Sequence, residues 1–292
     1  MPDKWTLIDI LNTSVDYLKK KGFENSRLDI ERLLCHSLQL KRVDLYVNFE
    51  RLLTNEEISN FKALLKRRLG NEPLQYILGE TEFMSLRFKV NPSVLIPRPE
   101  TEVLVEKVIE IFRDADQPAF MDIGTGSGNI AISVAKHLSR SRIVCVDIDD
   151  GALEVASANA AQNDVADRLV FVKADVTDSA FHGHFDTPFD AVISNPPYIS
   201  RADYEELPEE IKKHEPLSAL LGGEDGMDYY KAIVTQANNG ILNEKGVLAL
   251  EIGYDQREDV ESLLEQSQFQ DIETLSDLAG RDRVVIARKS SK

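Results

Sequence analysis

Four consecutive residues, Asn195, Pro196, Pro197 and Tyr198, form the segment of this chain with the most specific chemistry. Two prolines in a row restrict the backbone and cannot donate hydrogen bonds, so the Pro196 carbonyl is held in one direction beside the Asn195 side chain. These two acceptors can converge on a planar –NH2 group, which has two N–H donors to satisfy them. Tyr198 can add a flat wall on which an amide or a base stacks. The segment therefore predicts a site for an amide or amino group.

A glycine-rich segment, Asp122-Ile123-Gly124-Thr125-Gly126-Ser127-Gly128, lies between a strand-like run and a helix-like run. Its glycines allow a tight turn, and we expect free backbone N–H groups there to face a ligand. The stretch from Gly126 to Ala131 also satisfies the degenerate dinucleotide fingerprint G-x-G-x-x-A, so an NAD-dependent dehydrogenase stays open. A Walker phosphate loop is excluded, because no Gly-Lys-Ser/Thr follows.

Acidic residues follow the next two strand-like runs. Asp147 comes about 20 residues after the glycines, where a carboxylate usually accepts hydrogen bonds from ribose hydroxyls. Asp149 is the competing residue, but its place directly before a helix-like run fits an N-cap. Asp175, followed by Val176, ends the third strand-like run at the same predicted sheet edge, within reach of a base. We therefore predict Asp147 and Asp175 as ligand-binding residues and Asp149 as a structural cap.

The glycine segment followed by Asn-Pro-Pro-Tyr resembles class I S-adenosylmethionine-dependent methyltransferases that act on amide or exocyclic amino nitrogens. Four further segments are similar to the peptide chain release factor glutamine methyltransferase family. They are Ile96-Pro97-Arg98-Pro99-Glu100-Thr101-Glu102, Glu215-Pro216-Leu217-Ser218-Ala219-Leu220, Gly222-Gly223-Glu224-Asp225-Gly226 and Asp277-Leu278-Ala279-Gly280-Arg281-Asp282-Arg283. With the N-terminal part included, the resemblance covers nearly the whole chain.

The resemblance implies methylation of the side-chain amide nitrogen of the glutamine in a Gly-Gly-Gln loop of class 1 translation release factors. It also implies which residues hold S-adenosylmethionine and its product S-adenosyl-L-homocysteine. The cofactor residues are Asp122, Gly124, Thr125, Gly126, Ser127 and Gly128 on the methionine side, Asp147 at the ribose, Asp175 and Val176 near the adenine, and Asn195. The glutamine would be held by Asn195, Pro196, Pro197 and Tyr198, of which Asn195, Pro196 and Tyr198 are the catalytic residues. Val176 stands where the family often has a larger side chain.

The expected catalysis relies on positioning, because a carboxamide nitrogen is a poor nucleophile whose lone pair is delocalised into the carbonyl. If Asn195 and the Pro196 carbonyl hold both N–H groups, the lone pair can be aimed at the methyl donor. Such alignment can lower the activation free energy by roughly several kcal/mol. The proton leaves after transfer, so no catalytic histidine is needed. His182 and His184 fit a solvated loop better than a metal site, and we expect no metal.

Other functions stay open from the residues alone. A glutamine of a ribosomal protein is an alternative substrate for the same chemistry. An adenine or cytosine amino methyltransferase could use the same four residues on a flipped base, but the chain shows no basic stripe with interleaved aromatic residues. A dehydrogenase leaves Asn-Pro-Pro-Tyr unexplained, and a non-catalytic binding protein leaves both intact motifs unexplained.

The elements that must position these residues alternate between strand-like and helix-like runs. Strands are predicted over 119–123, 142–148, 169–174, 189–194 and 246–252, and helices over 99–113, 129–138, 150–163, 227–239 and 256–266. Apolar strands joined by helices indicate a parallel, doubly wound sheet. The last two strands, 269–275 and 283–288, lie too close together for a parallel crossover, so one is expected to be antiparallel. The predicted fold class is α/β, with a mostly parallel seven-stranded sheet of the Rossmann-like methyltransferase type.

The first 72 residues have apolar residues at helical spacing, which predicts a small helical bundle. Gly22 is expected to end its first helix, and Thr54 with Glu57 predicts a capping box for a helix over 55–69. Residues 73–99 are predicted to be a hairpin linker with strands near 75–78 and 86–90, and residues 100–292 the methyltransferase domain. The bundle shows no chemical site, and we interpret it as a docking module for the substrate.

Composition limits the partners and the compartment. The 292 residues carry 34 Lys+Arg against 50 Asp+Glu, a formal net charge of −16. Residues 1–72 hold 13 basic and 11 acidic residues, and the rest hold 21 and 39. This acidic surface disfavours a phosphate backbone, so no direct nucleic-acid partner is expected. Two cysteines, no apolar run of membrane length and no signal-peptide pattern in the first ten residues predict a cytoplasmic protein with no membrane partner.

Overall fold

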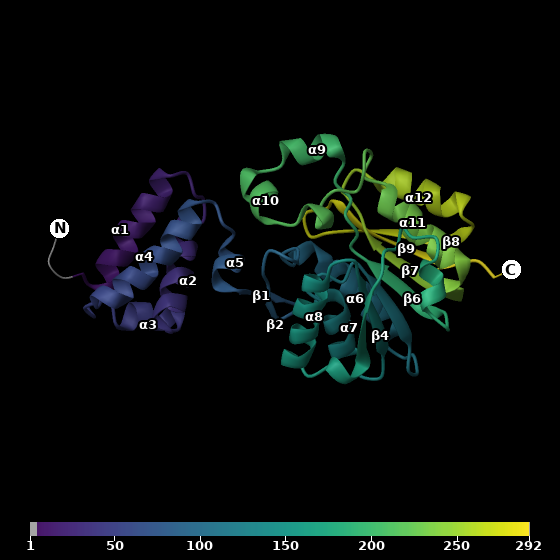
Figure 1. Ribbon diagram of the computed structural model, residues 1–292, viewed down its shortest axis with the longest axis horizontal. Coiled ribbons are helices and arrows are strands. Elements are labelled where there is room, and N and C mark those ends of the chain that lie inside the picture. Colours follow the sequence, from purple (N-terminus) through teal and green to yellow (C-terminus); the bar gives the residue numbers. More distant parts are fainter. Residues whose placement is uncertain (1–4, 292) are drawn as a thin grey trace. The chain divides into compact units, whose positions relative to one another are not determined.

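The computed structural model describes residues 5–291 as two compact units that divide after Gly79 (Figure 1). The first four residues of the N-terminal segment considered above, and residue 292, lie outside the described part. Within that part, no helix combines the length and the apolar character needed to cross a membrane.

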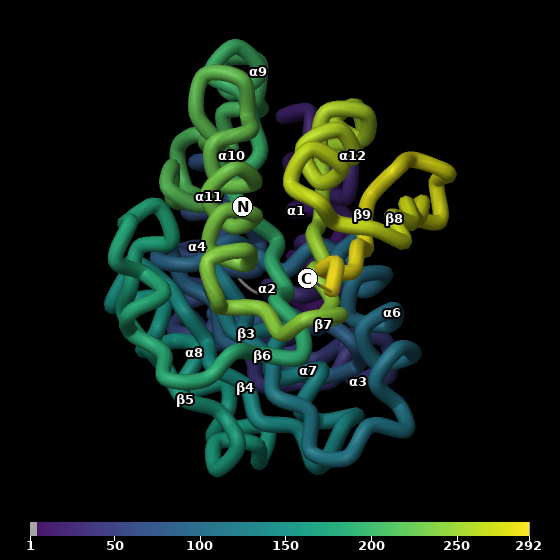
Figure 2. The backbone as a smooth tube through the Cα atoms, turned by 90° about the vertical axis from the view of Figure 1, so that its right-hand side faces the viewer, coloured from purple at the N-terminus to yellow at the C-terminus, as the bar shows by residue number. Residues whose placement is uncertain are grey.

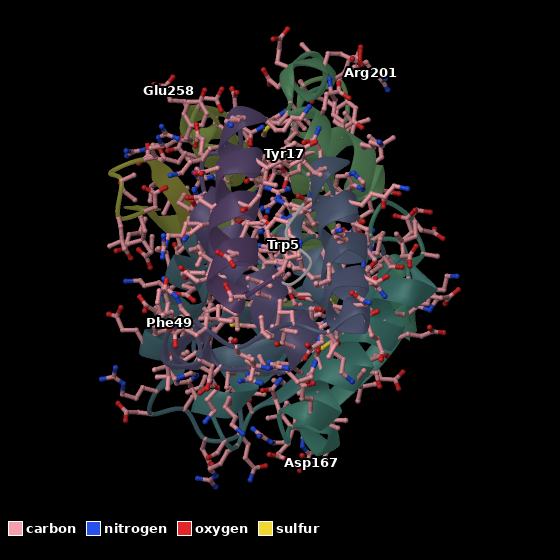
Figure 3. The ribbon with its side chains drawn as sticks, turned by 90° about the vertical axis from the view of Figure 1, so that its left-hand side faces the viewer. Trp5, Tyr17, Phe49, Asp167, Arg201 and Glu258 are labelled. Carbon is pink, nitrogen blue, oxygen red and sulfur yellow. The ribbon has the colours of Figure 1, made fainter. Side chains whose placement is uncertain are left out.

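The first unit is a helical bundle. It contains α1 (Leu7–Lys20), α2 (Ser26–Leu38), α3 (Arg42–Val47), α4 (Asn55–Leu69) and α5 (Leu74–Leu78). The predicted capping box of α4 is confirmed, since the Thr54 hydroxyl accepts from Glu57 N–H and the Glu57 carboxylate from Thr54 N–H. Tyr17 and Phe49 lie on this unit and are each 46% exposed (Figure 3).

The predicted strand near 75–78 is wrong, because this segment forms the short helix α5. Leu74 and Ile77 are three residues apart and both join the apolar core of the bundle, which a helix allows and an alternating strand does not. Gly79 ends the helix in the left-handed conformation, with φ 76°. The hairpin itself is made by β1 (Glu80–Phe83) and β2 (Leu86–Lys89), which confirms the second predicted strand.

The second unit is built on a seven-stranded sheet. Its strands are β3 (Ala119–Ile123), β4 (Arg142–Asp147), β5 (Leu169–Lys173), β6 (Phe189–Ser194), β7 (Leu242–Glu251), β8 (Phe269–Ser276) and β9 (Asp282–Lys289). They lie in the order β5-β4-β3-β6-β7-β9-β8. All neighbours pair in parallel up to β7, and β9 pairs antiparallel with both β7 and β8. The predicted fold class is therefore confirmed, with the last strand as the antiparallel one.

Helices cover both faces of this sheet (Figures 1 and 2). The core on one face receives apolar residues from α6 (Glu102–Phe112), α7 (Asn129–His137), α8 (Asp150–Gln162) and the hairpin. The core on the other face receives them from α11 (Asp228–Gln236) and α12 (Arg257–Gln266). Neighbouring strand residues alternate between the two cores, as Phe120 and Met121 do, which is the period expected of a sheet buried on both sides.

The topology places the two chemical motifs together. β3 lies between β4 and β6, so the chain leaves β3 toward one side of the sheet and later returns to its other side at β6. The loops that follow β3 and β6 diverge at this switch point, where doubly wound sheets bind their ligands. After β6, the short helices α9 (Arg201–Glu206) and α10 (Glu209–His214) project from one end of the unit (Figures 1 and 2).

Candidate active site

A cavity of about 1020 Å³, counted out to its open mouth, lies at the carboxyl ends of β3, β4, β5 and β6. Its wall contains most of the residues predicted from the sequence. They are Gly124, Thr125, Gly126, Ser127, Asp147, Asp175, Val176, Asn195, Pro196 and Pro197. Of the predicted site residues, Asp122, Gly128 and Tyr198 are not part of the wall and lie behind it.

The glycine segment shapes the wall mainly through its backbone. Gly124, Gly126 and Gly128 have φ of 72°, 52° and 79°, in the left-handed region that glycine adopts at little cost. A Cβ added at Gly124 would meet nothing within 4 Å, so this glycine keeps the cavity open. At Gly128 it would come within 2.9 Å of Ile132 Cδ1 and 3.2 Å of Ala156 Cβ, so this glycine leaves room for α8 beside the start of α7.

The expectation of free N–H groups along this segment is wrong for most of it. The N–H groups of Gly124 and Thr125 both donate to the Val146 carbonyl, at 2.9 and 3.0 Å. Gly128 N–H donates to the Thr125 carbonyl at 2.8 Å, and Gly126 N–H to Asp147 Oδ2 at 2.9 Å. The bonds to Val146 and Asp147 hold the loop to β4, and the bond from Gly128 closes the turn itself, because a turn this tight needs partners for its own polar groups.

Asp122 supports the loop from behind. Its side chain is fully buried, and Oδ2 accepts a hydrogen bond from the Thr125 hydroxyl at 2.7 Å. Burial raises the pKa of Asp122 to about 7, while the Thr125 hydroxyl opposes that shift. The residue therefore acts on the shape of the loop from a position away from the cavity.

Asp149 takes the capping role that the sequence assigned to it, whereas ligand binding by Asp147 stays a prediction. Asp147 is in the cavity wall, and its carboxylate accepts from the N–H groups of Gly126 and Asp149 at 2.9 and 3.0 Å. Burial raises its pKa above the ordinary value, and these backbone donors oppose the rise. Asp149 caps α8 by accepting from Ala152 N–H at 3.0 Å.

Asp175 and Val176 follow β5 and border the same cavity. Asp175 accepts from the Thr177 N–H and hydroxyl at 2.8 and 2.7 Å, which fixes the turn after the strand. Val176 is only 6% exposed and belongs to the apolar core beneath this part of the wall. The wall here thus combines one acid with an apolar surface.

Asn195 is connected to a buried chain of hydrogen bonds that the sequence did not reveal. Its Nδ2 donates to Thr101 Oγ1 at 3.2 Å, and the Thr101 hydroxyl donates to Glu251 Oε2 at 2.6 Å. The Tyr198 hydroxyl donates to Glu251 Oε1 at 3.4 Å, and burial raises the pKa of this tyrosine. The Tyr198 hydroxyl therefore joins this network, and the stacking role predicted for its ring stays a prediction.

The backbone after Asn195 is fixed by a neighbouring glycine-rich segment. Ile199 N–H donates to the Leu220 carbonyl at 3.0 Å, and Gly222 N–H donates back to the Ile199 carbonyl at 2.9 Å. A Cβ on Gly222 would lie 2.5 Å from the Pro197 carbonyl oxygen, and one on Gly226 would lie 2.4 Å from that of Tyr198. Only glycine fits at these two positions, which gives the Gly-Gly-Glu-Asp-Gly motif a structural reason.

The remaining motifs meet at the same edge of the sheet. Arg98, in the cavity wall, donates from Nη2 to both carboxylate oxygens of Glu215 at 2.6 and 2.8 Å. Asp277 accepts from Arg281 N–H at 3.1 Å and pairs with Arg283, which in turn donates to the Ile252 carbonyl. The partners Arg98, Thr101 and Glu215 lie in motifs that the sequence singled out, but only the fold shows what each contacts.

Glu251 is the functional candidate that sequence reasoning missed. It ends an apolar strand and is 1% exposed. A single carboxylate at the end of a buried strand was the available signal, since such a group needs hydrogen-bond partners. Within residues 5–291, no group of three or more His, Cys, Asp or Glu residues is placed to hold a metal ion.

The wall fits an S-adenosylmethionine-type cofactor. Gly124 leaves open space beside bare backbone, where the polar end of a ligand can lie close to the chain. Asp147 offers carboxylate oxygens at the end of β4, and Val176 offers an apolar patch after β5. The distribution of backbone, acid and apolar surface matches that of a nucleoside joined to a polar amino-acid chain.

Known proteins resemble this chain over nearly its full length. The PrmC N-terminal domain family matches residues 9–79, and the methyltransferase small domain family matches residues 99–213. The release factor glutamine methyltransferase of Geobacter sulfurreducens is 43% identical over 287 residues, which cover 98% of each chain. That of Chlorobaculum tepidum is 39% identical and covers 97% of this chain and 98% of the relative. A methyltransferase structure from Pyrococcus furiosus covers 80% of this chain and all of its own, with a TM-score of 0.52 and 17% identity, which shows a shared fold.

Proposed function

The chain belongs to the release factor glutamine methyltransferase family, and from this premise we propose that it methylates the glutamine of the Gly-Gly-Gln loop in class 1 release factors, using S-adenosylmethionine. The observation that carries this proposal is the meeting of two loops at one cavity. The wall from Gly124 to Ser127 and the wall from Asn195 to Pro197 face the same space, so a methyl donor and an amide can meet there.

The cofactor side of the proposal assigns a role to each strand end. Gly124 to Gly128 would surround the methionine part, with Asp122 and Gly128 acting from behind the wall. Asp147 would accept from the ribose hydroxyls, because its oxygens retain lone pairs beyond those used by Gly126 and Asp149. Asp175 and Val176 would border the adenine. The bound cofactor supplies an electrophilic methyl group on a sulfonium.

The substrate side of the proposal rests on Asn195 and the Pro196 carbonyl. Thr101 holds Asn195 Nδ2, which leaves Oδ1 as the end of the carboxamide that can accept a substrate N–H. The Pro196 carbonyl is the second acceptor for the same –NH2 group. With both N–H groups held in plane, the nitrogen lone pair is directed out of that plane toward the methyl donor. Pro197 stiffens this segment, and the nitrogen loses its extra proton after transfer.

We also propose that the helical bundle docks the protein substrate. The cavity wall is built by residues between Ser93 and Ile233, all within the second unit. The bundle exposes apolar side chains on and after α3, with Val43, Val47 and Phe49 exposed by 60%, 71% and 46%. Substituting Val43 and Val47 together with Glu is expected to raise KM for the intact release factor at unchanged cofactor affinity. An unchanged KM would contradict the docking role.

The function is tested by transfer of labelled methyl from S-adenosylmethionine to three acceptors in parallel. These are a purified release factor, the same factor with its Gly-Gly-Gln changed to Gly-Gly-Ala, and an adenine-containing DNA. Label on the first alone supports the proposal. Label on the DNA contradicts it and indicates a base methyltransferase. Label on neither protein contradicts it as well, and ribosomal proteins are then the next acceptors to test.

A further inference from the structure

Glu251 lies at the end of β7, on the far side of Thr101 from the cavity. Its carboxylate is almost completely buried, and its Oε2 accepts the Thr101 hydroxyl at 2.6 Å. Thr101 is itself 1% exposed and accepts from Asn195 Nδ2 at 3.2 Å. Burying a carboxylate costs free energy unless it is hydrogen-bonded. The partner of this carboxylate is a hydroxyl that contacts Asn195, the proposed substrate-binding residue.

The direction of these bonds follows from the chemistry of the three groups. An ionised carboxylate can only accept, so the single hydroxyl hydrogen of Thr101 must point to Glu251. The lone pairs of Thr101 Oγ1 can then only accept, which suits the –NH2 end of Asn195 and excludes its carbonyl end. One ionised acid thereby decides which way the carboxamide faces.

We propose that Glu251, acting through the Thr101 hydroxyl, is a positioning residue that keeps Asn195 Oδ1 turned toward the substrate amide. This inference rests on the proposed function, because it concerns how Asn195 accepts the glutamine N–H. A reversed carboxamide would present –NH2 to the substrate –NH2, and two donors repel. The relay therefore acts on the alignment of the nitrogen and leaves the cofactor side untouched.

The surroundings of Glu251 make its protonation part of the relay. Four elements place titratable groups against it: Glu100 beside Thr101, Tyr198 after β6, Tyr230 on α11 and Arg283 on β9. Burial raises the pKa of Glu251 to about 7, while Thr101 and Arg283 oppose the rise and Glu100 adds to it. A protonated Glu251 can donate to Thr101, and the Thr101 hydrogen is then free to turn toward Asn195 Oδ1.

A kinetic test uses Thr101→Val, Thr101→Ser and Glu251→Gln in the full-length protein with release factor as substrate. Thr101→Val and Glu251→Gln are expected to lower kcat roughly 10- to 100-fold, with cofactor KM within about twofold of wild type. Thr101→Ser keeps the hydroxyl and is expected to recover most of the kcat lost in Thr101→Val. Equal losses in the valine and serine variants, or wild-type kcat in Thr101→Val, would overturn the relay.

The pH profile gives a readout that packing alone does not move. Wild-type kcat is expected to fall as the pH drops through about 7, because protonation of Glu251 releases the Asn195 carboxamide. Thr101→Val and Glu251→Gln are expected to lack this limb, since neither has a titrating acid connected to Asn195. An acid limb of unchanged midpoint in both variants would contradict the proposal.

A spectroscopic measurement separates this inference from the proposed function. The side-chain ¹⁵N–¹H signals of Asn195 are identified by their loss in Asn195→Ala. In the wild type they are expected to shift as Glu251 titrates, and in Thr101→Val this pH dependence is expected to vanish. If wild type transfers no methyl to a release factor, the proposed function fails while these signals still decide the relay. Signals that respond to pH identically in both proteins would refute the relay even if methyl transfer is observed.

Discussion

The two loops that border the cavity start from adjacent parallel strands, yet one presents mainly backbone to the cavity and the other a side-chain amide and two prolines. The loop after β3, residues 124–128, offers mainly bare backbone, most of whose N–H groups are already bonded within the protein. The segment after β6 places a side-chain amide and two prolines in the cavity wall, and we propose that Asn195 Oδ1 and the Pro196 carbonyl accept from the substrate there. Each loop is supported by a threonine hydroxyl that donates to a buried carboxylate, Thr125 to Asp122 and Thr101 to Glu251.

The difference between the two supports lies in where they lead. Thr125 and Asp122 are three residues apart and close a local turn, so they fix the shape of a binding surface. Thr101 and Glu251 are 150 residues apart and continue to Asn195, so they fix the direction of a single polar group. A binding surface and an aligned group contribute to different steps. We therefore expect substitutions in the first loop to change cofactor affinity and those in the second to change turnover.

The largest effect is expected from Asn195→Ala, which removes the aligned group itself. Turnover should fall on the order of 100-fold or more, because the substrate amide loses an acceptor that directs its lone pair. Cofactor affinity, measured by calorimetry, should stay within a few fold of wild type. Near-normal turnover, or an equally large loss of cofactor affinity, would contradict the expectation that the second loop affects turnover and the first affects cofactor affinity.

Asp147→Ala should have the opposite effect, with weaker cofactor binding and little change in turnover. Removing a carboxylate that accepts from Gly126 N–H, and that we propose accepts from the ribose hydroxyls, is expected to weaken cofactor binding roughly 10- to 100-fold, with kcat at saturation nearly unchanged. Asp149→Ser is the matched control two residues away, because serine can replace it as the N-cap of α8. Equal losses of cofactor affinity in both variants would mean that the strand end as a whole, and not Asp147, carries the binding.

Gly124→Ala tests whether bare backbone is the useful feature of the first loop. A residue with a Cβ at φ 72° costs roughly 1–2 kcal/mol, and the added methyl enters open cavity space. The backbone strain is shared by the free and the cofactor-bound enzyme and therefore lowers stability, whereas the methyl takes space from the ligand, so cofactor affinity is expected to drop about tenfold, or about 1.4 kcal/mol. Gly280→Ala is the control, because Gly280 also has a positive φ of 76° and open space for a Cβ but lies outside the cavity wall. Tighter cofactor binding by Gly124→Ala would show that the loop needs contacts more than space.

The same contrast explains what could be read from the sequence. The glycines, Asp147 and Asn195 follow directly after their strands, so local order along the chain was enough to predict their place at one edge of the sheet. Thr101 and Glu251 are bonded across 150 residues, and no local pattern pairs them. Their partnership exists only once η1 (Pro99–Thr101) and β7 are folded into one unit.

One secondary-structure expectation failed because tertiary contacts outweighed local pattern, and one buried contact could not be seen in the local pattern at all. The run Gln75 to Leu78 looks β-like, but burial of Leu74 and Ile77 in the bundle core selects a helix. The bond from the Tyr198 hydroxyl to the buried Glu251 was not visible in the sequence, and the stacking role of Tyr198 stays a prediction. In both cases the deciding partner lies far away in the sequence.

The smallest expected effect concerns the contribution of Asp122, the buried acid of the first loop, to the free energy of unfolding. The pKa of Asp122 is about 7 in the folded protein and near 4 in an unfolded chain, so the folded state holds its proton to higher pH. Stability is therefore lost as the pH rises through 7, and between pH 6 and 8 this group lowers the unfolding free energy on the order of 1 kcal/mol. Asp122→Asn removes that slope, which denaturant unfolding at several pH values would measure.

Asp167→Asn is the control for this measurement, because the Asp167 side chain is 80% exposed and stands at the surface (Figure 3). It should leave the slope of the wild type unchanged. If Asp122→Asn flattens the slope without changing kcat at saturating cofactor, the first loop is supported by a local acid with no part in turnover. If kcat loses its pH dependence in Asp122→Asn as it does in Glu251→Gln, both acids act on Asn195. The two loops would then contribute to the same step.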